Sequence, residues 1–141
     1  MKNPLTKTFW ALIATFILIV SWFTIQALGY DIARSLFPVL ATLGLIFLIL
    51  GVLLIYHTVK QKVKGPLKIF LILTGAAPPA AFLSAILHNL VYGLMIVIFG
   101  IEFWGPNGDE AFFFMLALIV FPIVFVIGVI GSLWIMFRKK K

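Results

Sequence analysis

The sequence predicts an all-α integral membrane protein with four transmembrane helices. Of its 141 residues, 64% are hydrophobic and only 11% are charged, against roughly 25% charged residues in an ordinary soluble domain. A chain this short cannot bury so much apolar surface by folding on itself alone. Its charges also fall into separate clusters, which leave long uncharged stretches between them. We therefore exclude a soluble globular protein, a disordered tail and a disulfide-stapled secreted module.

Four uncharged stretches are long enough to cross a bilayer, since about 20 residues suffice for a helix. They are 23, 25, 33 and 27 residues long. We predict a single transmembrane bundle over residues 1–141. Its approximate crossings are residues 8–29, 36–57, 69–101 and 111–137.

The distribution of cations predicts how the protein sits in the membrane. Ten of its eleven Lys and Arg residues lie at the N-terminus, at the C-terminus and in the segment 60–68. Four crossings place these three segments on one side, and the positive-inside rule makes that side cytoplasmic. We therefore predict a multi-pass protein of the cell membrane with both termini in the cytoplasm. Contact with anionic lipid head groups explains the net charge of +7 without nucleic acid.

The first two crossings are predicted mainly from the length of their uncharged stretches. The stretch 8–29 follows two lysines like a signal peptide, but it is longer than the usual 7–15-residue apolar segment of one. Asp31 and Arg34 lie three apart in the expected outer turn. Pro38 then suits the first turn of the second helix, where a missing N–H costs little.

The third stretch is too long for a simple crossing. As one helix, residues 69–101 would measure about 50 Å, against a hydrocarbon core of about 30 Å. Pro78 and Pro79 remove two backbone donors within it. Two arrangements fit: one long helix kinked at these prolines, or a separate interfacial or re-entrant helix over residues 66–77 followed by the crossing. We expect a kink or break at Pro78-Pro79.

The fourth crossing follows an outer loop that contains three acids. Glu102, Asp109 and Glu110 lie in a stretch of turn-forming residues, and we expect them to be solvated charges. The helix over residues 111–137 contains Pro122, which predicts a mild kink.

One dense polar group lies inside the predicted hydrocarbon region. It consists of Ser84, His88, Asn89 and Tyr92 on the third helix. An intramembrane ionisable residue is a functional-site candidate, because placing it there is costly. A neutral imidazole hydrogen-bonded to neighbouring side chains would instead lock the bundle. Both interpretations of His88 stay open at this point.

Small residues on the third and fourth helices predict a helix-packing seam. Such residues allow the backbones of two helices to approach closely. The predicted seam comprises Ala77, Ala81, Ala85 and Gly93 on the third helix and Gly128 and Ser132 on the fourth.

The sequence carries no recognisable catalytic or cofactor-binding pattern. It has no cysteine, which excludes thiol chemistry and thiolate metal sites. None of its acids falls inside a crossing, and it lacks a Ser–His–Asp set, a zinc spacing and a phosphate loop. Haem bound between His57 and His88 is disfavoured, because they lie at different expected depths. We expect no enzymatic activity, no cofactor and no metal.

Two hypotheses for the function remain. The first is a non-catalytic accessory or scaffolding subunit that acts through helix–helix packing, as a homo-oligomer or within a larger membrane complex. The alternative is an oligomeric channel or transporter for an ion or small solute. In that case Ser84, His88, Asn89 and Tyr92 line the pathway. The extramembrane loops are too short to hold a catalytic domain.

Overall fold

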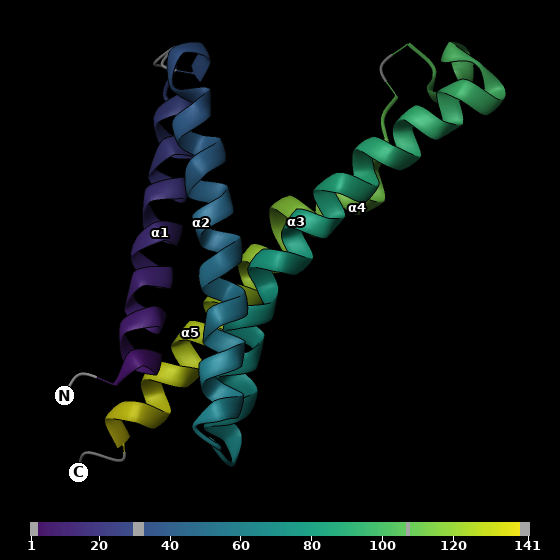
Figure 1. The fold of residues 1–141 in the computed structure, drawn as a ribbon. Helices are drawn as coiled ribbons and strands as arrows, with labels where there is room; N and C mark the ends of the chain where they lie inside the picture. Colours follow the sequence, from purple (N-terminus) through teal and green to yellow (C-terminus); the bar gives the residue numbers. More distant parts are fainter. Residues whose placement is uncertain (1–2, 30–32, 107, 139–141) are drawn as a thin grey trace.

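The computed structural model describes residues 3–29, 33–106 and 108–138 and is helical, without strands, over those residues (Figure 1). Its long helices are α1 (Pro4–Ala27), α2 (Ala33–Lys60) and α3 (Pro66–Phe99), joined by the short η1 (Ile101–Trp104) to a fourth rod made of α4 (Ala111–Met115), η2 (Leu116–Val120) and α5 (Phe121–Arg138). Within the described ranges, four helices are long and apolar enough to span a membrane, as expected of a multi-pass membrane protein. Their bounds lie within a few residues of those predicted. The predicted outer turn at Asp31 and the terminal cations Lys2 and Lys139–Lys141 lie outside the described residues.

Side-chain hydrogen bonds join α1 to α2 at the end of the hairpin where α1 begins. Asn3 caps α1 by accepting from the N–H of Leu5, and its side-chain amide pairs with that of Gln61 through two hydrogen bonds of 2.7 and 2.6 Å. One turn further along, the Thr8 hydroxyl lies 3.1 Å from His57 Nδ1. Because that hydroxyl already donates to the Pro4 carbonyl, His57 Nδ1–H is the donor to Thr8.

Two glycines bring α2 and α3 into close contact. A Cβ atom added to Gly51 would lie 2.6 Å from the carbonyl oxygen of Gly75 and 3.1 Å from the Pro78 ring. A Cβ atom added to Gly75 would lie 2.8 Å from the carbonyl oxygen of Gly51. The two backbones therefore touch at a point where any side chain would force them apart.

Helix α3 runs without interruption from Pro66 to Phe99. The alternative of a separate helix over residues 66–77 is therefore wrong, although a kink at Pro78-Pro79 stays a prediction. Pro66 occupies the first turn of α3, where its missing N–H costs nothing. Pro78 and Pro79 lie in the interior and deprive two carbonyls of their helical donors.

The fourth rod changes its helical geometry just before Pro122. Residues Leu116–Val120 form a π-helical turn, in which the N–H of Phe121 bonds to the carbonyl of Leu116, five residues back. Pro122 has no N–H to offer the carbonyl four residues before it, and its ring crowds that carbonyl. A wider turn at this point relieves the crowding.

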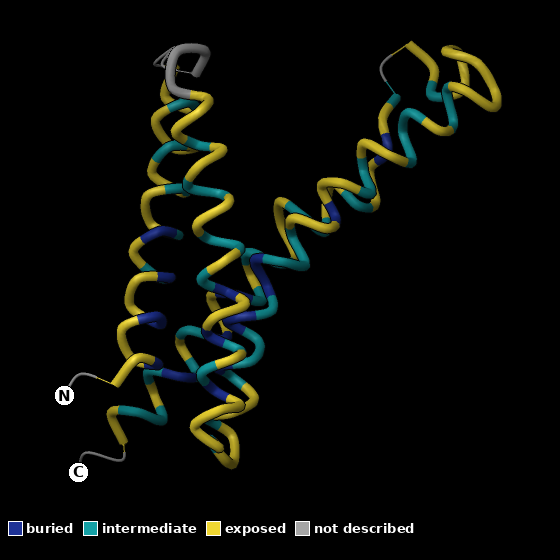
Figure 2. The backbone as a smooth tube through the Cα atoms, viewed as in Figure 1, coloured by how far each residue is buried: buried dark blue, intermediate teal, exposed yellow. Residues whose placement is uncertain are grey.

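The helices meet around one apolar core at the end that carries both termini and the α2–α3 loop. Its fully or nearly fully buried members are Leu5, Phe9, Leu12, Leu54, Leu71, Ala77 and Phe125. Figure 2 shows that the buried positions gather in this half of the molecule. Beyond it, the α1–α2 hairpin and the arm formed by the later part of α3 with α4 diverge like the limbs of a V (Figure 1).

Candidate functional site

The predicted polar group lies on the arm, where His88 contacts the loop that precedes α4 and Tyr92 contacts Trp104 of η1. Ser84, His88 and Tyr92 follow one another at intervals of four, so they share one face of α3. Ser84 is 5% exposed, and the His88 side chain is 16% exposed. Asn89 lies on an exposed neighbouring face, where its amide donates to the Ala85 carbonyl. The structure thus brings three of the four residues onto one covered face and separates the fourth.

His88 lies against Glu110, the residue that directly precedes α4. Its Nδ1 lies 2.8 Å from the Glu110 carbonyl oxygen and 3.3 Å from Glu110 Oε2. Both oxygens can only accept, so Nδ1 carries the proton and donates to them. The imidazole ring also packs on Phe114, with 5.4 Å between ring centroids. His88 therefore ties α3 to the first turn of α4.

Glu110 is buried, and it both contacts His88 and caps α4. Its carboxylate accepts hydrogen bonds from the N–H groups of Phe112 and Phe113, at 2.9 to 3.1 Å, and so caps α4. The Glu110 residue is only 6% exposed. The expectation that this acid is a solvated charge is therefore wrong, because an apolar helix beginning at Ala111 needs acceptors for its first N–H groups.

The environment of Glu110 favours its charged form. Burial raises the pKa of the Glu110 carboxyl, but hydrogen bonds from the Phe113 N–H, from His88 and from the Phe112 N–H outweigh burial. Together with the attraction of His88, they hold the pKa below its ordinary value of 4.5. Glu110 is thus ready to act as an anionic cap at neutral pH.

Asp109 completes the cluster from the solvent side. Its Oδ1 accepts from the Glu110 N–H at 2.7 Å and lies 3.8 Å from His88 Nε2. The Asp109 side chain is 57% exposed, as predicted for this loop. Because the two carboxylates approach opposite nitrogens of one ring, they do not converge on a common point. Among the described residues, no group of three or more His, Cys, Asp or Glu side chains could hold a metal ion.

The loop reaches His88 because it folds back along the arm. Trp104 donates from Nε1 to the Tyr92 carbonyl at 3.2 Å, and its ring stacks on Tyr92 with 5.9 Å between centroids. The chain then returns beside α3 to Glu110 (Figure 1). His88 lies 22 residues beyond Pro66 in an unbroken helix, a rise of about 33 Å. His88 therefore lies far along α3 from the α2–α3 loop.

The predicted packing seam divides into an inner and an outer part. Ala77, Gly128 and Ser132 are buried where α5 crosses α3. There a Cβ atom on Gly128 would lie 2.5 Å from Thr74 Oγ1. The outer part follows the arm: Ala81 is half-buried, Ala85 is exposed, and a Cβ atom added to Gly93 would meet nothing within 4 Å.

Sequence reasoning missed two features of this region. The cap by Glu110 has a recognisable signal, since an acid directly before an apolar run marks a helix start. The return of the loop along α3 has no comparable signal, because it depends on the Tyr92–Trp104 stack between segments twelve residues apart.

Comparison of the chain with protein-family models, curated proteins and solved structures found no match.

Proposed function

We propose that this protein is a non-catalytic accessory or scaffolding subunit of the membrane, which packs through α3 against a second copy or another membrane protein. One observation carries the proposal: two rows of residues spaced four apart along α3 differ in exposure. We call them the polar ladder (Ser84, His88 and Tyr92) and the small ladder (Ala85, Asn89 and Gly93). The polar ladder with Ser84, His88 and Tyr92 is covered by contacts within the chain. In the small ladder Ala85 and Asn89 are exposed, and a Cβ atom added to the half-buried Gly93 would meet nothing within 4 Å.

The small ladder has the composition that helix pairs use in membranes. Small side chains give no particular advantage in contact with lipid tails. In contact with another helix, Ala85 and Gly93 allow its backbone to approach α3 closely. Asn89 adds an exposed amide within otherwise apolar surroundings. An amide in that position can hydrogen-bond across a helix pair, which adds to packing.

The alternative of an oligomeric channel or transporter receives less support. A pathway along Ser84, His88, Asn89 and Tyr92 needs these groups to face one space. Ser84 is buried, Tyr92 stacks on Trp104, and His88 donates to Glu110. The loop and the first turn of α4 would have to leave α3 before Ser84, His88 and Tyr92 could line one open space.

Replacement of Ala85 by Leu tests the proposal directly. The added bulk would separate the two backbones, and we expect association to weaken about tenfold or more, which corresponds to about 1.4 kcal/mol. Ala14→Leu is the matched control, because Ala14 is an exposed helical alanine on α1. Native mass spectrometry after gentle extraction from the membrane gives the stoichiometry of each variant.

The outcomes separate the two functions. Loss of assembly in Ala85→Leu but not in Ala14→Leu, with a modest effect of His88→Ala, supports packing through the small ladder. Assembly that survives Ala85→Leu counts against it. The transport alternative predicts pH-dependent flux in liposomes that His88→Ala abolishes.

A further inference from the structure

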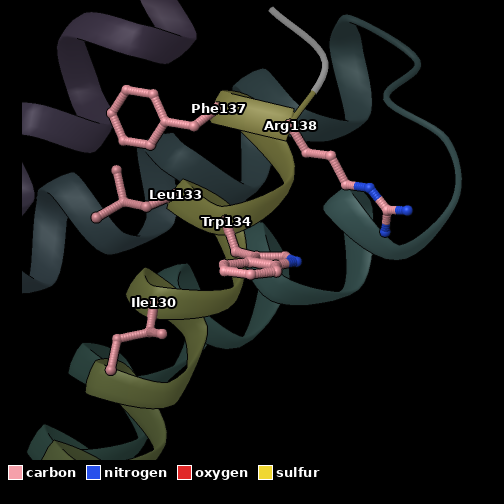
Figure 3. A pocket seen from close by; sticks show the side chains of 5 residues that line it. All are labelled: Ile130, Leu133, Trp134, Phe137 and Arg138. Atoms are coloured by element: carbon pink, nitrogen blue, oxygen red, sulfur yellow. The ribbon is translucent and has the colours of Figure 1, made fainter. Parts of the chain in front are cut away.

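An open apolar hollow lies beside the last two turns of α5 (Figure 3). It has a volume of about 540 Å³ and is lined by Ile130, Leu133, Trp134, Phe137 and Arg138. Four of these side chains are apolar or aromatic, and Arg138 is the single charged one. In Figure 3 the side chains of Trp134 and Arg138 extend to the same side of the helix. The hollow therefore has an apolar body and a cationic end.

The hollow lies at the strongly cationic end of the molecule. Figure 1 places the end of α5 at the same end as the start of α1 and the α2–α3 loop. Those segments carry Lys7, Lys60, Lys62, Lys64 and Lys68, and the chain continues from Arg138 into three further lysines. A ligand here meets an apolar surface and positive charge together.

We propose that this hollow binds one anionic phospholipid of the cytoplasmic leaflet. An acyl chain lies along Ile130, Leu133 and Phe137, and the phosphate accepts from the Arg138 guanidinium, whose planar fork suits phosphate oxygens. The Trp134 indole, one turn deeper, lies at the boundary where such rings are favoured. The charge complementarity selects an anionic lipid over a zwitterionic one. The inference needs only the proposed membrane orientation and is independent of assembly through α3.

Fluorescence quenching tests occupancy at Trp134 itself. The full chain carries four tryptophans, and Trp10→Phe, Trp22→Phe and Trp104→Phe together leave Trp134 as the only reporter. The protein is reconstituted into phosphatidylcholine vesicles that contain a small fraction of brominated phosphatidylglycerol or, in parallel, of brominated phosphatidylcholine. We expect quenching to require about fivefold less brominated phosphatidylglycerol, the factor that corresponds to one cation near an anionic surface.

Two variants separate a specific site from general attraction. Arg138→Gln should abolish the preference for brominated phosphatidylglycerol. Lys68→Gln removes the same charge from the same end of the molecule but does not line the hollow, so the preference should persist. Native mass spectrometry of the chain with all its tryptophans, counting retained phosphatidylglycerol with and without Arg138→Gln, gives a second measurement that is independent of the tryptophan replacements.

Three results would overturn the proposal. Equal quenching by the two brominated lipids would show that the hollow does not select charge. Equal loss in Arg138→Gln and Lys68→Gln would reduce the effect to general surface attraction. Quenching that disappears as the protein-to-lipid ratio rises would assign the hollow to a second copy of the chain. None of these results depends on the outcome for Ala85→Leu.

Discussion

At the scale of single residues, the contact between His88 and Glu110 determines where the fourth rod begins. One carboxylate caps two N–H groups of α4 while an imidazole from α3 donates to the same residue. A helix end in apolar surroundings leaves its first N–H groups without partners unless a side chain supplies them. The contact between Glu110 and His88 therefore both caps α4 and holds its first turn against α3.

The depressed pKa of Glu110 predicts an acid-labile contact. The native state favours the carboxylate, so its contribution to stability is complete above pH 4.5 and is lost as the pH falls below that value through the lower folded pKa. Thermal unfolding in detergent between pH 7 and pH 3 should show a smaller acid-induced fall in Tm for Glu110→Gln than for the wild type. Glu102→Gln, which removes an exposed acid of η1, is the control. An identical fall in wild type and Glu110→Gln would contradict this role.

At the scale of elements, glycines determine how closely α2 approaches α3. Gly51→Ala would place a Cβ atom 2.6 Å from the Gly75 carbonyl oxygen, and overpacking of this kind costs about 1–3 kcal/mol. Gly44 lies on the same helix with nothing within 4 Å. Gly44→Ala should therefore be neutral or stabilise by up to about 1 kcal/mol through helix propensity. Titration with SDS in mixed micelles measures both free energies of unfolding, and equal effects of the two substitutions would refute the close contact.

The sequence predicts the helices well because each depends on local information. Length, apolarity and flanking charges were enough to place all four helices within a few residues of their observed bounds. The continuity of α3 through Pro78-Pro79 was not predictable in the same way. The two prolines weaken the helix locally, whereas packing of Gly75 and Pro78 on Gly51 supports it from another segment.

The sequence predicted a shared helix face for three residues of the polar group, but not the residues that contact them. The spacing of Ser84, His88 and Tyr92 was enough to place them on one face of a helix. That Glu110 meets His88 depends on a contact between residues 22 apart in sequence. The length of the loop alone does not show that it folds back along α3.

At the scale of the whole molecule, the V-shaped arrangement concentrates intramolecular packing at one end. The core residues come from α1, α2, α3 and α5, whereas the outer parts of the hairpin and the arm expose large apolar side chains (Figure 2). In a bilayer those surfaces contact lipid or a partner helix. The shape therefore leaves more helix surface available for assembly than a bundle packed along its full length would.

The same arrangement predicts a topology that can be tested with single cysteines, because the chain has none of its own. Lys64 lies exposed in the α2–α3 loop, and Pro106 lies exposed near the tip of the arm. Ten of the eleven cations belong to the N-terminal segment, the C-terminal segment and residues 60–68, so the positive-inside rule predicts that Lys64 lies in the cytoplasm and Pro106 outside. In intact cells a membrane-impermeant maleimide should label Pro106→Cys, and it should label Lys64→Cys only after permeabilisation. Labelling of Lys64→Cys in intact cells would reverse the orientation and remove the cytoplasmic leaflet from the proposed lipid site.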